Sequence, residues 1–191
     1  MSSAPPRPMH RLTFRDLSPT RACLVTPDGD RPLLAFAGCN YLGLSTHPQV
    51  HAALISSLGR FGISASASRQ TTGNVSVHEE LEAALAAHMG CPGAVLTPEG
   101  YTANLALAEI LARRQPVALI DARSHRSIAH AMQAAGIECR WFPHADVGAA
   151  ADAIQTMRRA ESGRPILIAS DGVFAADGSI APLPGLIALL G

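Results

Sequence analysis

Hydrophobic residues along this chain change from an irregular distribution near the N-terminus to a regular alternation of short apolar runs and amphipathic segments. Short apolar runs typical of strands lie at 33–37, 94–97, 117–120, 138–142 and 166–170. Helical spacing predicts helices at about 46–61, 76–85, 101–112, 127–135 and 147–160, and a last apolar stretch covers 186–190. This order predicts an α/β fold with a mainly parallel sheet that is covered by helices on both faces.

Local signals refine the first part of this pattern. Capping-box spacing occurs at Thr46-His47-Pro48-Gln49, where the proline suits a first helical turn, and again at Ser76-Val77-His78-Glu79. Between these two helix starts, residues 62–75 are rich in Ser, Ala, Thr and Gly without periodicity, which indicates a long ordered or functional loop. Residues 1–30 are interpreted as an N-terminal arm that includes a turn at 27–30.

Composition excludes several classes of function. The formal net charge is zero, so no nucleic acid or anionic membrane is expected as a partner. No apolar run approaches the ~20 residues of a membrane span, and the first eight residues lack the apolar core of a signal peptide, which predicts a cytoplasmic protein. The four cysteines (Cys23, Cys39, Cys91, Cys139) and the eight histidines are scattered, so we expect free thiols and no metal site.

Three predicted strands are followed by residues that could serve a ligand, because ligands bind beyond the carboxyl ends of parallel strands. Gly100, after the run at 94–97, would let an anion approach the N–H groups at a helix start, although many such turns contain glycine. His125, after 117–120, could stack on a planar heterocycle, act as an acid or base, or simply face solvent. Asp171, after 166–170, opens an acidic turn that could orient a cationic ring nitrogen or merely cap a loop.

A series of short motifs links these positions in order. They are Cys39-Asn40-Tyr41-Leu42-Gly43-Leu44, His47-Pro48, Phe61-Gly62, Ala67-Ser68-Arg69, Gly73-Asn74, His78, Leu81-Glu82, Gly100-Tyr101-Thr102-Ala103-Asn104, Asp121, Ser124-His125-Arg126-Ser127-Ile128, Phe142-Pro143-His144-Ala145-Asp146, Asp171-Gly172-Val173-Phe174, Asp177-Gly178 and Ala181-Pro182-Leu183. Together they resemble the α-oxoamine synthase family over about residues 33–190. These fold-type-I pyridoxal-phosphate enzymes join a small amino acid to an acyl-CoA or another acyl thioester with loss of carbon dioxide.

The resemblance implies roles for individual residues. Gly100 and Tyr101 would meet the phosphate of pyridoxal 5'-phosphate with their backbone N–H groups, His125 would stack on the pyridine ring, and Asp171 would lie near that ring. Ser68 and Gly73 would line the acyl-CoA entrance near the interface of a homodimer. Cys39 stands where the family usually has an asparagine that positions the substrate.

The chain departs from the family at several positions. All fifteen basic residues are arginine, whereas the family holds the cofactor aldehyde as a Schiff base on a lysine, for which a guanidinium is no substitute. Glu99 stands where a small hydroxyl residue commonly precedes the glycine, and a carboxylate there would repel phosphate. Ala175 replaces a serine that usually contacts the cofactor.

The resemblance places the lysine, and the aspartate that pairs with the ring nitrogen, beyond residue 191. Residues 31–191 are therefore interpreted as the N-terminal part of the cofactor-binding domain of an acyltransferase that is inactive alone, with the remainder encoded beyond it or as a complementing C-terminal half. The alternatives are a non-catalytic pseudoenzyme or interaction module of the same fold, and a class II aminotransferase. The segments 40–43 and 125–128 favour the synthase over the aminotransferase.

Overall fold

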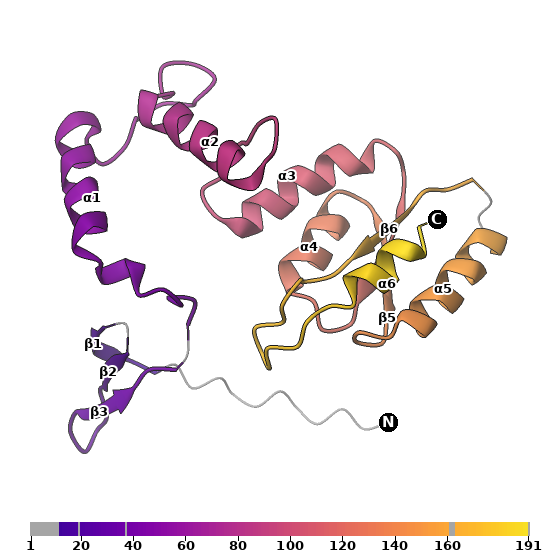
Figure 1. The fold of residues 1–191 in the computed structure, drawn as a ribbon, viewed down its shortest axis with the longest axis horizontal. Helices are drawn as coiled ribbons and strands as arrows, with labels where there is room; N and C mark the ends of the chain where they lie inside the picture. Colours follow the sequence, from indigo (N-terminus) through magenta and orange to yellow (C-terminus); the bar gives the residue numbers. More distant parts are fainter. Residues whose placement is uncertain (1–11, 19, 37, 161–162, 191) are drawn as a thin grey trace. The chain divides into compact units, whose positions relative to one another are not determined.

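The computed structural model describes residues 12–18, 20–36, 38–160 and 163–190, and it divides the chain into two compact units, 1–92 and 93–191 (Figure 1). The first eleven residues of the predicted arm lie outside the described part. Each unit has its own secondary structure, and the two are taken in turn.

The first unit begins with a three-stranded antiparallel sheet of β1 (Phe14–Leu17), β2 (Arg21–Leu24) and β3 (Arg31–Leu34), in the order β1-β2-β3. The segment interpreted as an arm thus supplies two strands. The turn at 27–30 joins β2 to β3, and the strand expected at 33–37 starts and ends earlier, because its pairing with β2 runs over 31–34.

The helices of this unit are α1 (Pro48–Phe61) and α2 (Ser76–Met89), with a 3-10 turn η1 (Leu44–Thr46) before α1. Both helices occur where the sequence predicts them, but the predicted caps are wrong. Nδ1 of His47 accepts the N–H of Gln49 at 3.3 Å, and Nδ1 of His78 accepts the N–H of Val75 at 3.4 Å. His47 takes the place of a capping hydroxyl, and His78 takes the place of the Glu or Gln of a capping box, so the Ser/Thr spacing misplaces both caps.

The second unit is a parallel sheet with helices between its strands. In chain order its elements are α3 (Gly100–Ala112), β4 (Val117–Asp121), α4 (Arg126–Ala134), β5 (Glu138–Phe142), α5 (Val147–Ala160), β6 (Ile166–Ala169) and α6 (Leu183–Ala188). The strand order is β5-β4-β6, and both pairings of β4 are parallel. The predicted α/β class with a parallel sheet is confirmed.

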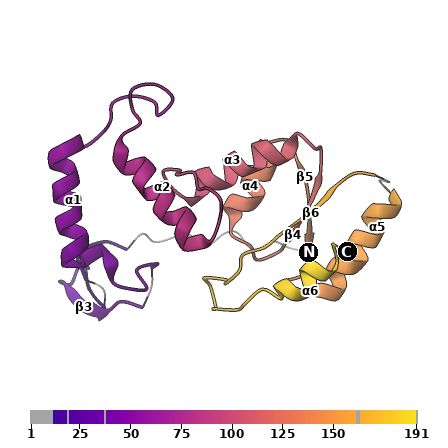
Figure 2. The same cartoon turned by 45° about the horizontal axis from the view of Figure 1, so that its top comes forward.

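Alternate residues of β4 point to opposite faces of this sheet, as the twofold period of a strand requires. Val117 and Leu119 pack in a cluster with residues of α5 and α6, whereas Ala118 and Ile120 pack with residues of α3 and α4. Figure 2 shows the resulting layers, with α3 and α4 on one side of the strands and α5 and α6 on the other. Every residue of β4 is buried, which makes it the centre of this unit.

The strand expected at 94–97 does not form. In the described part of the chain this segment belongs to no ladder, and Val95 is 86% exposed. A strand requires a neighbour for its N–H and C=O groups, so an apolar run alone does not produce one.

Candidate functional site

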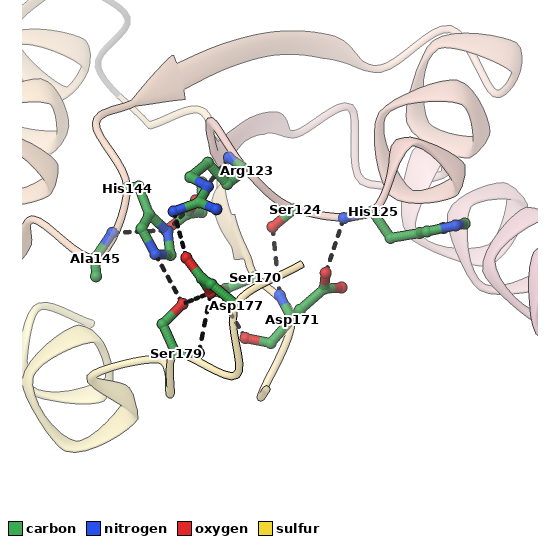
Figure 3. Close-up of polar contacts among 10 residues, drawn as sticks. Arg123, Ser124, His125, His144, Ala145, Ser170, Asp171, Asp177 and Ser179 are labelled. Atoms are coloured by element: carbon green, nitrogen blue, oxygen red, sulfur yellow. Dashed lines mark hydrogen bonds and ion pairs between the residues drawn. The ribbon is translucent and has the colours of Figure 1, made fainter. Parts of the chain in front are cut away.

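The strongest concentration of polar contacts lies at the carboxyl edge of the parallel sheet. The loop after β4 leads to α4, which packs on one face of the sheet, and the segment after β6 leads to α6, which packs on the other face. The N–H of His125 donates to Asp171 Oδ2 at 2.9 Å, and the N–H of Asp171 donates to Ser124 Oγ at 3.3 Å (Figure 3). Two sequence-predicted residues, His125 and Asp171, therefore meet here.

The imidazole of His125 is held by the start of α4, where His125 is the N-cap. Its Nδ1 accepts the N–H of Ser127 at 3.3 Å and lies 2.6 Å from Ser127 Oγ, which in turn accepts from Nδ2 of Asn104 on α3 at 2.9 Å. Because Nδ1 is the acceptor, the proton of the neutral ring sits on Nε2. The ring is exposed and points away from Asp171 in Figure 3, so a planar ligand can reach it.

Glu99 occupies the start of α3, where Gly100 and Tyr101 were predicted to meet an anion. The N–H of Tyr101 donates to Glu99 Oε2 at 2.8 Å, and the N–H of Thr102 donates to Oε1 at 2.8 Å. Hydrogen bonds from the Thr102 hydroxyl and from these N–H groups lower the pKa of Glu99. The Tyr101 hydroxyl lies 2.7 Å from Nδ1 of His130, which ties α3 to α4.

A second polar cluster, which the sequence reasoning did not assign, surrounds the last residue of β4. The side chain of Asp121 is 1% exposed. Its Oδ1 accepts the N–H of Arg123 and its Oδ2 the N–H of Ala145, both at 2.8 Å, and Nδ1 of His144 donates from 3.1 Å. Burial raises the pKa of Asp121, but these hydrogen bonds outweigh it and leave the pKa below its usual value.

The cluster continues to the segment that follows β6. Nε2 of His144 lies 3.1 Å from Ser179 Oγ, which donates to Asp177 Oδ1 at 2.7 Å, and Asp177 Oδ2 pairs with Arg123 Nη1 at 2.7 Å. The Ser179 hydroxyl is the main cause that lowers the pKa of Asp177 to about 2, with Arg123 contributing less. The buried ring of Phe174 packs edge-on against His144, with centroids 4.3 Å apart. This polar chain fastens the 171–181 segment to the ends of β4 and β5.

One sequence signal could have identified this cluster. Asp121 directly follows a run of four apolar residues, and a carboxylate at the end of a buried strand must be paired to be tolerated. His144 and Ser179 carry no comparable local signal, because they come from other parts of the sequence and meet Asp121 only through the fold.

Cys39, Ser68 and Gly73 belong to the first unit, so their predicted roles near a substrate stay predictions. Cys39 is an exposed free thiol. The carbonyl of Ser68 accepts the N–H of Gly73 at 3.0 Å, and a Cβ at position 73 would lie 2.0 Å from the carbonyl oxygen of Ala67. Only glycine fits this turn, which gives Gly73 a structural role.

Two kinds of feature are absent from the residues that the structure describes. Within that part of the chain no group of three or more His, Cys, Asp and Glu side chains is arranged to hold a metal ion. In the same residues no helix has the length and apolar character to cross a membrane.

Comparison with known proteins assigns this architecture. Residues 31–190 match the family model described as aminotransferase class I and II. Curated relatives include the 8-amino-7-oxononanoate synthase of Maricaulis maris (strain MCS10), 36% identical over 179 residues, and that of Bordetella petrii, 39% identical over 169 residues. The alignments cover 94% and 86% of this chain but 45% and 41% of the relatives, so the chain spans less than half of their length.

Solved structures give the same assignment. A serine palmitoyltransferase from S. paucimobilis with a bound PLP–myriocin aldimine superposes with a TM-score of 0.83 at 29% identity, covering 94% of this chain and 44% of that one. The 8-amino-7-oxononanoate synthase of Francisella tularensis has a TM-score of 0.64 at 21% identity over 81% of this chain and 41% of its own, and it supports the fold.

The residues present fit pyridoxal phosphate only in part. The exposed ring of His125 and the adjacent Asp171 suit a planar heterocycle. The N–H donors at the start of α3, however, are taken by Glu99, and the chain contains no lysine to bond the aldehyde. The residues near the ring thus fit the cofactor, whereas those at the start of α3 do not fit its phosphate.

Proposed function

This chain belongs to the aminotransferase class I and II family, and from that premise we propose that it is part of a pyridoxal-phosphate-dependent enzyme that condenses a small amino acid with an acyl thioester, releasing carbon dioxide. The observation that carries this proposal is the contact between His125 and Asp171 at the carboxyl edge of the sheet. Pyridoxal phosphate, when bound, withdraws electrons from the α carbon of an amino acid. His125 and Asp171 would hold the ring in place.

We further propose that activity requires a segment this chain does not supply, because no residue here offers the amine that anchors the cofactor. An apolar hollow between β6 and α6 supports such a partner. It is lined by Ile168, Ser170, Leu183, Leu186, Ile187 and Leu190, of which Ile187 is 65% exposed. The complementing C-terminal half, or a homodimer of the complete protein, would cover this surface.

The alternatives remain a pseudoenzyme and a class II aminotransferase. The capping of α3 by Glu99 favours the pseudoenzyme. The names of the curated relatives favour the synthase over the aminotransferase.

The test combines the chain with the C-terminal portion of the Maricaulis maris relative, which begins where the similarity ends. After addition of pyridoxal phosphate and desalting, we expect visible absorbance to persist in the complex and to disappear from the chain alone. With small amino acids and acyl-CoAs, including L-serine and palmitoyl-CoA, the complex should release free coenzyme A thiol only when an amino acid is present.

Variants make this test specific. His125→Ala should weaken cofactor retention and thiol release, whereas His88→Ala, at an exposed position on α2, should change neither. Amino-group transfer to a keto acid without thiol release would replace the synthase by the aminotransferase. A stable complex that retains no cofactor would establish the pseudoenzyme.

A further inference from the structure

We propose that Glu99 is an internal competitor for phosphate at the start of α3, so that the chain binds pyridoxal and pyridoxal phosphate with similar affinity. The identity of the ligand rests on the proposed function. The competition itself rests only on the contacts of Glu99, and the experiment below separates the two.

The carboxylate of Glu99 is bound through both oxygens. Oε2 accepts the N–H of Tyr101, while Oε1 accepts the N–H of Thr102 and, at 2.5 Å, the Thr102 hydroxyl. The next N–H, that of Ala103, donates to the main-chain carbonyl of Glu99 at 3.2 Å. These groups form the first turn of α3, which is the part of a helix that binds anions. A phosphate can bind there only if it displaces the side chain of Glu99.

Phosphate binding at the start of α3 is opposed by the charge and the hydrogen bonds of Glu99, and not by a lack of space. A Cβ built on Gly100 meets nothing within 4 Å, so a ligand can approach the backbone. Glu99 itself is exposed, and its side chain is able to rotate away. A phosphate dianion must therefore break the hydrogen bonds that Glu99 accepts, and it then lies close to the displaced carboxylate, which repels it. Phosphate and Glu99 thus compete for the same N–H groups.

The carboxylate is present at neutral pH, because hydrogen bonds from Thr102 and Tyr101 hold the pKa of Glu99 below its usual value. A charge at a helix N-terminus is a modest effect at an exposed site. We therefore expect Glu99 to lower phosphate affinity on the order of tenfold.

The experiment uses the full chain labelled with ¹⁵N and three variants. Glu99→Ser keeps a capping hydroxyl without charge, and Glu99→Gln keeps nearly the same shape. Glu109→Gln removes a charge from an exposed position on the same helix, away from its start, and is the matched control. The amide signals of Tyr101 and Thr102 are followed during titration with inorganic phosphate, and the affinities for pyridoxal and pyridoxal phosphate are measured by dialysis.

We expect phosphate to shift both amides in Glu99→Ser at about one tenth of the concentration that the wild type and Glu109→Gln require, with Glu99→Gln between them. Glu99→Ser should also prefer pyridoxal phosphate over pyridoxal about tenfold, whereas the wild type should show no preference. A wild type whose amides respond at the same phosphate concentration as those of Glu99→Ser, or a Glu99→Ser variant whose amides do not respond, overturns the proposal. If neither form of the cofactor binds but phosphate still shifts the Glu99→Ser amides, the competition stands and the proposed function fails.

Discussion

Replacement of Asp121 by asparagine tests whether the buried carboxylate holds the end of β4 together. The two oxygens of Asp121 each accept one backbone N–H, from Arg123 and from Ala145. Asparagine has one oxygen, so its amide nitrogen must face one of these N–H groups and leave it without an acceptor. The side chain is 1% exposed, and water has little access to relieve this.

The magnitude follows from these contacts. A buried N–H that loses its acceptor costs about 1–3 kcal/mol, and the loss of a charge-assisted bond from His144 adds about 1 kcal/mol. We expect Asp121→Asn to lower the free energy of unfolding by about 3 kcal/mol. With a urea slope of about 2 kcal/mol per molar, the unfolding midpoint should fall by about 1.5 M.

The assay is urea unfolding followed by circular dichroism at neutral pH, with Asp152→Asn on the exposed face of α5 as the control. The difference between wild type and variant should also depend on pH. The pKa of Asp121 is lower in the folded chain than in the unfolded one, so its stabilising effect is complete above about pH 4 and is lost as the pH falls below that value. A midpoint shift no larger than that of Asp152→Asn, or one that grows in acid, would refute this reasoning.

Two further predictions concern close contacts. Gly73→Ala should lower the melting temperature and expose the 62–75 loop to limited proteolysis, because a Cβ at position 73 overlaps the backbone. Gly93→Ala is the control and should change neither, because a Cβ at position 93 has nothing within 4 Å. If the two variants behave alike, the contact at position 73 is not as close as the structure has it. In an NMR titration, Ser179→Ala should raise the pKa of Asp177 from about 2, because the Ser179 hydroxyl is the largest single cause that lowers it, and an unchanged pKa would contradict that role.

Periodicity predicted most elements of the second unit well, because apolar residues recur in them at the spacing of a strand or a helix. The predicted bounds of β5 and α5 agree with the structure, and α3, β4, α4 and β6 differ from prediction by one residue at one end or at both. In each case a buried face imposes the spacing of hydrophobic residues, and that spacing can be read directly from the sequence.

Prediction failed where a feature depends on a distant neighbour. The run at 94–97 has the composition of a strand but belongs to no ladder in the described residues, whereas β1 and β2 lack such a composition yet pair with each other, and β2 also pairs with β3. The same reason explains the site. His125 and Asp171 follow predicted strands and could be selected in advance, whereas the link from Asp121 through His144 to Ser179 joins three separate segments. The capping role of Glu99 depends on a side-chain conformation that spacing does not reveal.

The central place of β4 in the order β5-β4-β6 also matters while the chain is being made. β5 leaves the ribosome soon after β4 and can cover one of its edges, but the other edge must wait for β6, which emerges roughly 1–5 s later at ~5–20 residues per second. During that interval an open row of N–H and C=O groups belongs to a strand whose residues are all buried in the folded unit. Such an edge can pair with the same strand of a neighbouring nascent chain. Chaperones are therefore most needed to protect β4 while several copies of this protein are being synthesised on one polysome.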